Sequence, residues 1–501
     1  MRFNLKIVFL VILGVIARFA FFPLRPLDGD EGIVIKIAQS ANLFELFANV
    51  AKDVHPPVFH FLEFLILKVA PVSEFSSRII SVLAGLIAVY FIYLVFKKLG
   101  SEKIAFWVAV LSTINPVLTY HFAETRPYGL QVLLIFINLY FFLKIKENAS
   151  AKSENTKDLI YFTIGSILMV LTAYLSFAIL LGELLYMVIF EGLHKLNYKK
   201  IISGVLVIGT FALLWGSNFL SQLQGRMSEQ SQTLQFKDNL LGLFNAFYRF
   251  FAGRMFLDLD PSISKNLEFL KSDPLKFIVF FLSIIVPLAL FVWGVVALFN
   301  KEKDNFYLIG CVFAPLILAA LISSEIGPRS ARYLLFLVPF CLYVILELVF
   351  LKKTLLKNLI FSVLIIIYAA AFVHGFYFER AKPGVNAIAR HLDKFGKVGD
   401  RILVRGGFGG GEELVLKYYL EKPSDFEITD LYGDYQTGNL AEIKSRDSLK
   451  YIKNFKSQSK AKNIWFYDMT YSFDDSKSGM DFEKNILGKD KENKDLVLYK
   501  F

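Results

Sequence analysis

The chain has 501 residues, a formal net charge of +11 and a mean hydropathy of +0.50. Hydrophobic residues make up 55% of the chain, a share that excludes an ordinary soluble enzyme. The positive charge gathers in short lysine-rich segments between apolar runs, which is typical of cytoplasmic membrane loops and argues against a nucleic-acid partner.

Apolar runs long enough to cross a bilayer recur along the chain and predict a polytopic α-helical membrane protein with about eleven transmembrane helices. The expected spans are 4–22, 77–97, 104–120, 128–145, 159–174, 176–192, 201–219, 276–299, 306–322, 332–351 and 358–376. The first run lacks a small-x-small cleavage site, so we expect it to be retained as a span.

Charge predicts the orientation of these spans. Lysines gather in the segments 97–103, 144–157, 194–200, 300–305 and 351–358. Since positive loops mark the cytoplasmic side, we expect a cytoplasmic N-terminus in a plasma or inner membrane. The opposite side would receive a first outer loop at 23–76, the segment "HFAETRPY", a longer outer loop at 220–275, the segment "SSEIGPRSAR" and the C-terminus. In the first loop, the apolar but charge-interrupted segments 31–50 and 56–70 predict two helices lying flat at the interface.

From about residue 381 the long apolar runs stop. The stretches "RILVRGG", "FEITDLY", "NIWFYDM" and "KDLVLYKF" are typical of short strands, and "GVNAIARHLDKFG" and "GEELVLKYYLEK" of helices. We therefore expect a transmembrane catalytic domain over 1–380 and a small extracytoplasmic α/β domain over 381–501. The glycines of "RGGFGGGEE" have the wrong spacing for a phosphate loop and indicate a strand-to-helix turn.

The motif "DGDE" directly follows the first span. A carboxylate at a membrane edge can be a solvated loop cap, or a general base that takes a proton from an attacking acceptor. Asp30 and Glu31 point in different directions, so one could act as the base while the other orients the acceptor or binds a cation.

Further polar clusters fall at the same predicted side. In "DVHPPVFHF", His55 precedes two prolines that favour a helix start, and it either contacts a phosphate or metal or is a bystander. In "YHFAETRPYGLQ", Glu124, Arg126 and Tyr128 crowd the mouth of two spans, where a structural Glu124–Arg126 salt bridge is the alternative to a substrate path.

Two arginines stand just outside a late span, in "EIGPRSARYLLFLVP". Arg329 and Arg332 lie on the side where positive charge is normally depleted. Such arginines favour an anion, either a specifically bound lipid phosphate or the headgroups of bulk lipid.

In this order, the motifs resemble the superfamily of protein O-mannosyltransferases and aminoarabinose-to-lipid-A transferases. These are GT-C glycosyltransferases that use lipid-linked sugars. The resemblance rests on "DE" after the first span, "HPP" at a helix start, the span 73–100, "ETRPYGLQ" and "RYLLFLVP". It implies a GT-C membrane domain, and a trailing α/β domain occurs in several members.

The resemblance also implies roles for individual residues. Asp30 resembles the catalytic base, and Glu31 sits at the neighbouring acidic position. The implied substrate-binding residues, which line the site or contact the donor phosphate, are His55, Glu124, Arg126, Tyr128, Arg329, Arg332 and Tyr333. Lipid A-modifying relatives carry an arginine shortly after the acidic pair and a lysine before the prolines. Here Gly32 follows the pair and His55 precedes the prolines, which favours the general bacterial or archaeal branch.

The sequence therefore predicts a membrane glycosyltransferase. It would move a sugar from a polyprenyl-phosphate donor to an extracytoplasmic acceptor, which could be lipid, glycan or protein, by inverting displacement. No cofactor is required by any motif, although Asp30, Glu31 and Glu124 could hold a divalent cation, Mg²⁺ or Mn²⁺. The alternatives are a transporter or flippase, which predicts charges deep within spans, and a polymerase of lipid-linked glycans, which would not need the acidic pair.

Overall fold

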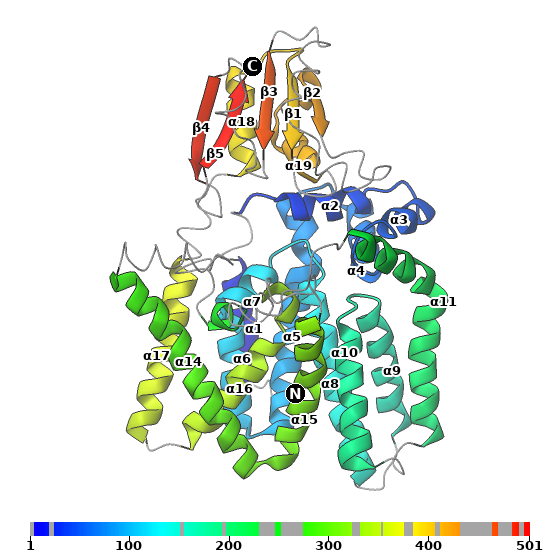
Figure 1. Cartoon of the computed structure of the whole chain (residues 1–501), viewed down its shortest axis with the longest axis vertical. Helices are drawn as coiled ribbons and strands as arrows, with labels where there is room; N and C mark the ends of the chain where they lie inside the picture. Colours follow the sequence, from blue (N-terminus) through cyan, green and yellow to red (C-terminus); the bar gives the residue numbers. More distant parts are fainter. Residues whose placement is uncertain are drawn as a thin grey trace.

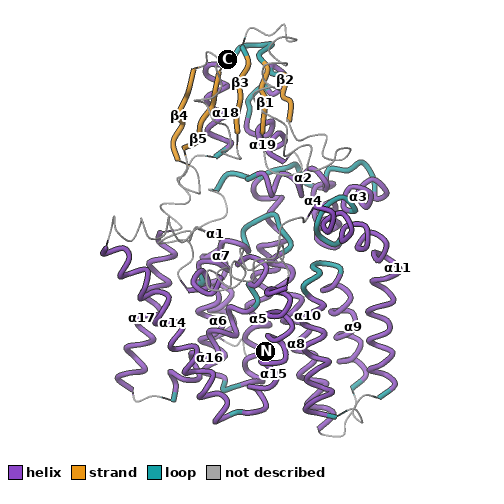
Figure 2. Tube along the Cα trace, viewed as in Figure 1, coloured by secondary structure: helices purple, strands orange, loops and turns teal. Residues whose placement is uncertain are grey.

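The computed structural model describes residues 5–19, 25–150, 155–192, 197–229, 246–251, 274–322, 331–351, 354–374, 384–405, 411–430, 463–468, 483–489 and 495–500. A bundle of upright helices fills one end of the molecule, and a small sheet with two helices stands at the other (Figure 1). Short helices lie between the two parts, as the trace in Figure 2 shows.

Every predicted span coincides with at least one helix of the bundle. These helices are α1 (Leu5–Phe19), α5 (Glu74–Leu99), α6 (Glu102–Ile114), α7 (Pro116–His121), α8 (Tyr128–Ser150), α9 (Thr156–Val170), α10 (Ser176–Tyr186), α11 (Tyr198–Glu229), α14 (Pro274–Lys301), α15 (Lys303–Ile322), α16 (Leu337–Phe350) and α17 (Thr354–His374). Within the described part of the chain, 3 helices are long and apolar enough to cross a membrane alone, namely Glu74–Leu99, Tyr128–Asn148 and Tyr198–Gln224. The number of crossings thus stays a prediction.

Two predicted spans are less regular than the apolar pattern suggested. The segment 104–120 is two helices, because the side chain of Asn115 accepts hydrogen bonds from the backbone of Val117 and Leu118 and starts α7 afresh. The segment 332–351 opens with a 3₁₀ turn, η3 (Ala331–Leu334), before α16. A π-helical turn, η1 (Met187–Glu191), extends α10.

The first loop of the bundle contains α2 (Gly29–Ala38), α3 (Leu43–Val50) and α4 (Val58–Val69). The expectation of one helix over 31–50 was wrong. The hydroxyl of Ser40 donates back to the carbonyl of Ile37, and Asn42 caps a new helix by accepting from the amide of Glu45. Phe44 on α3 is 85% exposed. An apolar face of this kind supports the interfacial placement, which stays a prediction.

The C-terminal α/β unit, as we name residues 384–500, is built on a 5-stranded sheet of order β2-β1-β3-β5-β4. Its strands are β1 (Arg401–Arg405), β2 (Glu427–Asp430), β3 (Ile464–Asp468), β4 (Glu483–Lys489) and β5 (Asp495–Lys500). Strand β1 pairs in parallel with β2 and β3, and β5 pairs antiparallel with β3 and β4. The helices are α18 (Val385–Phe395) and α19 (Gly411–Tyr419), and η5 (Pro423–Asp425) is a short 3₁₀ turn.

Helix α2 lies where the bundle and the α/β unit meet. Its Val34 belongs to the apolar core of the bundle, whereas Ile35 belongs to the core of the α/β unit. Ile37 packs into a third cluster with residues of α3, α4 and α11. The helix that carries the acidic motif is therefore fixed on several sides.

Candidate functional site

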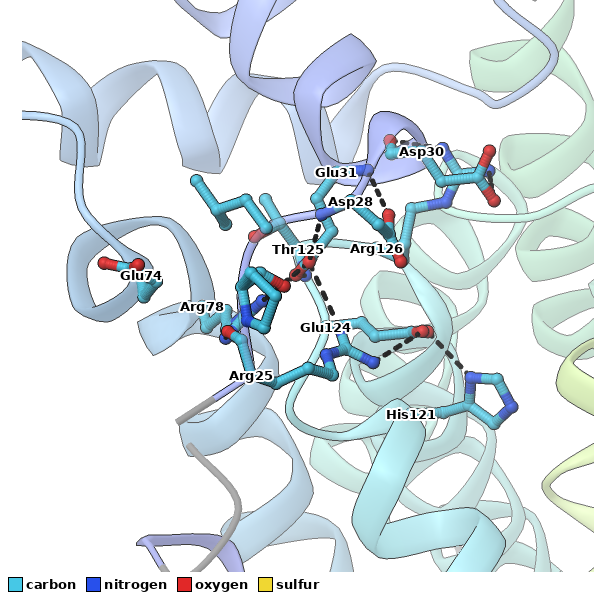
Figure 3. A network of polar contacts seen from close by, with 12 residues as sticks. Arg25, Asp28, Asp30, Glu31, Glu74, Arg78, His121, Glu124, Thr125 and Arg126 are labelled. Atoms are coloured by element: carbon cyan, nitrogen blue, oxygen red, sulfur yellow. Dashed lines mark hydrogen bonds and ion pairs between the residues drawn. The ribbon is translucent and has the colours of Figure 1, made fainter. Parts of the chain in front are cut away.

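The acidic motif begins α2 as a capping box. The side chain of Asp28 accepts a hydrogen bond from the amide of Glu31 at 3.0 Å, and the carboxylate of Glu31 accepts one from the amide of Asp28 at 3.2 Å. Of the two roles considered for the acidic motif, loop cap or general base, Asp28 therefore has that of the cap. The box also fixes the first turn of α2, so that Asp30 and Glu31 point in different directions (Figure 3).

Glu31 points inward and has no exposed surface. Its carboxylate accepts from Nε and Nη2 of Arg78 at 2.8 and 2.7 Å, and from the amide of Thr125 at 2.9 Å. Nη2 of Arg25 lies 3.2 Å away. Arg78 is equally buried and also donates to the carbonyls of Arg25 and Pro26. This buried ion pair ties α2 to α5 and to the turn before α8 (Figure 3).

Asp30 points outward and meets two arginines. Its side chain is 46% exposed, and its Oδ2 accepts from Nη1 of Arg332 at 2.8 Å. Nη2 of Arg126 lies 3.9 Å from the same oxygen, while its Nη1 donates to the backbone carbonyl of Asp30 at 3.2 Å. The fold thus brings together Asp30, Arg126 and Arg332 from distant parts of the sequence.

Aromatic rings support the two guanidinium groups. The ring of Tyr128 lies 5.9 Å from the guanidinium of Arg126 and 5.8 Å from that of Arg332, and Tyr333 packs edge-on against it. Burial lowers the pKa of Arg126, but Tyr128 and Asp30 nearby outweigh burial and raise this pKa above its ordinary value. Arg126 therefore stays cationic and suits an anionic ligand.

Glu124 does not form the predicted alternative pair with Arg126. It accepts from Nη1 of Arg25 at 3.2 Å and lies 2.7 Å from Nδ1 of His121 (Figure 3). This arrangement leaves the guanidinium of Arg126 on the side of Asp30.

His55 lies next to this group but is buried, with 6% exposure, and packs edge-on against Tyr128. Burial and the charge of Arg126 lower the pKa of His55 to about 3, so the ring is neutral at physiological pH. A neutral imidazole can contact a substrate but adds no positive charge to a phosphate site.

Several participants were not among the predicted site residues. Arg25 and Arg78 fix Glu31, and His60 lies 3.2 Å from Asp53 within a buried group beside His55. For Asp53 and His60, the spacing of the acid and the histidines in "DVHPPVFH" was a local signal; the motif contains neither arginine. Arg329 lies outside the described residues.

The predicted metal candidates are engaged by other side chains. Asp30 pairs with Arg332, Glu31 with Arg78, and Glu124 with His121 and Arg25. Among the described residues, no group of three or more histidine, cysteine or acidic side chains is placed to hold a metal ion. Arginines pair with one carboxylate oxygen of Asp30 and with both oxygens of Glu31, so a divalent cation at these acids stays a prediction.

Comparison with known proteins gives one family match. A family model described as dolichyl-phosphate-mannose-protein mannosyltransferase matches residues 54–215. No protein of curated function matches the chain in sequence.

Two solved structures share the fold over most of the chain. ArnT from Cupriavidus metallidurans, bound to undecaprenyl phosphate, has a TM-score of 0.56 and 10% identity, covering 98% of this chain and 97% of that one. The oligosaccharyltransferase of Archaeoglobus fulgidus, in complex with Zn and sulfate, has a TM-score of 0.56 and 14% identity, covering 92% and 68%. At such identities the likeness is one of fold. With the family match, it confirms the GT-C resemblance predicted from the motifs.

Proposed function

We propose that this chain, with its GT-C glycosyltransferase fold, transfers a sugar from a polyprenyl-phosphate donor to an acceptor outside the cytoplasm. One observation carries the proposal: a half-exposed carboxylate, Asp30, stands between the guanidinium groups of Arg126 and Arg332. The arginines suit the phosphate of the donor, and the carboxylate suits the proton of an acceptor hydroxyl or amine.

The proposed reaction is a single displacement at the anomeric carbon. The acceptor oxygen or nitrogen forms a bond to that carbon as the bond to the phosphate oxygen breaks, and Asp30 takes the acceptor proton. Arg126 and Arg332 stabilise the charge that develops on the leaving polyprenyl phosphate. The rings of Tyr128 and Tyr333 pack against these guanidinium groups and fix their orientation. Direct displacement inverts the anomeric centre.

Glu31 takes a positioning role in this mechanism. It could reach a substrate only by giving up the buried pair with Arg78, which leaves two charges without water. The capping box and this pair instead hold the first turn of α2, so that Asp30 faces the arginines.

The fold and the family match support a lipid-linked donor, because ArnT was solved with undecaprenyl phosphate. We further propose the predicted topology: a multi-pass membrane protein with a cytoplasmic N-terminus, about eleven spans and the α/β unit outside the cytoplasm. The acceptor could be lipid, glycan or protein.

The test uses membranes that contain the chain and radiolabelled undecaprenyl-phosphate mannose, glucose or galactose as donor. Transfer of label from donor to membrane or added acceptors is measured for the wild type and for Asp30→Asn. We expect Asp30→Asn to abolish transfer at normal expression. Asp425→Asn, which removes the same charge from η5 of the α/β unit, is the matched control and keeps wild-type transfer. Full activity of Asp30→Asn would remove this residue from the mechanism.

A further inference from the structure

The hydrophobic core of the C-terminal α/β unit includes residues from the start of the chain. Leu27 and Ile35, before and within α2, are 1% and 0% exposed and pack with Ile388, Val415 and Leu416 of the unit. A 10-residue helix is too short to be stable alone in water, so its position depends on what packs against it. For α2, part of that packing comes from the α/β unit.

Glycines allow the two parts to approach very closely. A Cβ atom added to Gly32 would lie 2.2 Å from the carbonyl oxygen of Gly411, and one added to Gly411 would lie 2.0 Å from that of Gly29. A Cβ on Gly29 would lie 1.8 Å from Oε1 of Glu412, and its other near neighbours are atoms of the same side chain. The start of α19 thus rests on the turn that carries Asp30.

Hydrogen bonds fix the other end of α19. The hydroxyl groups of Tyr418 and Tyr419 donate to the two carboxylate oxygens of Glu74 at 2.8 and 2.7 Å. The hydroxyl of Tyr419 also accepts from the amide of Leu27 at 2.8 Å. This arrangement links α19 both to α5 and to the segment that leads into α2.

The same turn of α5 anchors the acidic motif. Glu74 stands four residues before Arg78, so both lie on one face of α5. Arg78 holds Glu31, the neighbour of Asp30. The hydrogen bonds of the two tyrosines of α19 and the ion pair of Glu31 therefore both attach to the start of α5, on the same face of that helix.

We propose that the docked α/β unit positions the catalytic carboxylate. Gly29, Gly32, Gly411 and the pair Tyr418–Tyr419 are positioning residues that hold the first turn of α2, and efficient transfer needs this contact intact. The inference rests on the proposed function, because it assigns Asp30 as the base. It adds a role for the α/β unit in turnover, distinct from binding of donor or acceptor.

The first experiment introduces a steric clash between α2 and α19 and then removes it with a second substitution. Gly29→Ala introduces a methyl group that meets Glu412. Turnover is measured with undecaprenyl-phosphate mannose, glucose or galactose, and hydrogen exchange is followed in the peptide 25–40. We expect kcat to fall by about tenfold to 100-fold, because misplacing a catalytic group by about 1 Å has an effect of that size. The donor KM should stay within about twofold, since Arg126 and Arg332 are unchanged, and exchange in 25–40 should rise at least about fivefold.

A second substitution should remove this steric clash. Glu412→Ala in the Gly29→Ala background removes the colliding side chain and should restore both kcat and exchange to within about threefold of the Glu412→Ala single variant. A general loss of folded protein would not be relieved in this way. If the double variant behaves like Gly29→Ala, the contact is not the cause and the inference is overturned.

The second experiment removes the tyrosine hydroxyls without changing the rings. Tyr418→Phe/Tyr419→Phe should lower kcat in the same direction and speed exchange in 25–40. Gly209→Ala on α11, where an added Cβ has no neighbour within 4 Å, is the control and should change neither quantity. Wild-type kcat and exchange in both Gly29→Ala and the tyrosine pair would overturn the inference.

The two proposals fail separately. A wild-type protein that transfers no sugar from any of these donors would overturn the proposed function. Exchange in 25–40 would still decide whether the α/β unit holds α2, because that measurement needs no substrate.

Discussion

The buried pair of Glu31 and Arg78 gives the sharpest test of how the two adjacent acids divide their roles. Both side chains have 0% exposure, and their closest atoms are 2.7 Å apart. Glu31→Ala would leave Arg78 buried without its carboxylate. We expect Glu31→Ala to be mainly a stability variant, in contrast to Asp30, whose half-exposed carboxylate contributes little to stability.

The expected magnitude follows from burial. Removing one partner of a buried ion pair costs about 3–5 kcal/mol, because the remaining charge has neither water nor counter-ion. For a chain of this size, that loss lowers the midpoint of thermal unfolding by roughly 3–5 °C. Arg78→Ala should have an effect of similar size. The double variant should lose less than the sum, with a coupling free energy of about 1–3 kcal/mol.

The assay is thermal unfolding of the purified variants in one detergent at one scan rate, since membrane proteins commonly unfold irreversibly. Glu147→Ala is the control, because Glu147 pairs with Lys98 at the surface and is 54% exposed there. It should shift the midpoint by no more than about 1 °C. If Glu31→Ala keeps the wild-type midpoint but loses transfer, Glu31 acts in the chemistry and the positioning role is wrong.

Two further predictions concern charge at the site. On α4, burial and the nearby charge of Glu31 raise the pKa of Glu63 to about 9 from an ordinary 4.5. Between these pH values folding takes up a proton, so the free energy of unfolding falls by about 1.4 kcal/mol for each unit by which pH rises. Glu63→Gln should therefore raise the unfolding midpoint more at pH 8.5 than at pH 5.5; an equal gain at both would contradict this. Asp30→Asn frees Arg332 and should lower the Kd of undecaprenyl phosphate by about threefold to tenfold in a thermophoresis titration, whereas weaker binding would show that Arg332 does not meet the phosphate.

Local patterns in the sequence predicted much of the fold. The long apolar runs became helices, and the short apolar stretches around Ile402 and Trp465 became strands that are buried on both faces, because such runs report burial directly. Strand β4 was missed, since "EKNILGK" is mostly polar and contains a glycine at an irregular register. The breaks at Asn42 and Asn115 were missed because side-chain caps interrupted runs whose hydropathy continues.

For the candidate site too, local features could be predicted from the sequence and long-range contacts could not. The spacing of Asp28 and Glu31 already matches a capping box, so that local role could have been predicted. The partners could not, because Arg78 lies 47 residues from Glu31 and Arg332 lies 302 residues from Asp30. Such pairs depend on how helices pack, and a single sequence carries no local signal for them. The charge pattern beside the late span and the family resemblance both pointed to Arg332, whereas no motif indicates that Tyr419 contacts the segment before α2.

The adjacency of the two acids has a physical reason. Successive residues on a helix point about 100° apart, so one carboxylate of a neighbouring pair can be buried while the other stays in solvent. Burial suits a group that anchors the helix through arginine, and partial exposure suits a group that must meet a substrate and exchange a proton. A lone acid would have to do both, and the arginine that fixed it would also compete for its oxygens. With Glu31 paired to Arg78, the first turn of α2 is anchored. Among the described residues, Asp30 pairs with Arg126 and Arg332, the proposed phosphate ligands. The donor phosphate could then draw these guanidinium groups away and leave Asp30 able to accept a proton when the sugar arrives.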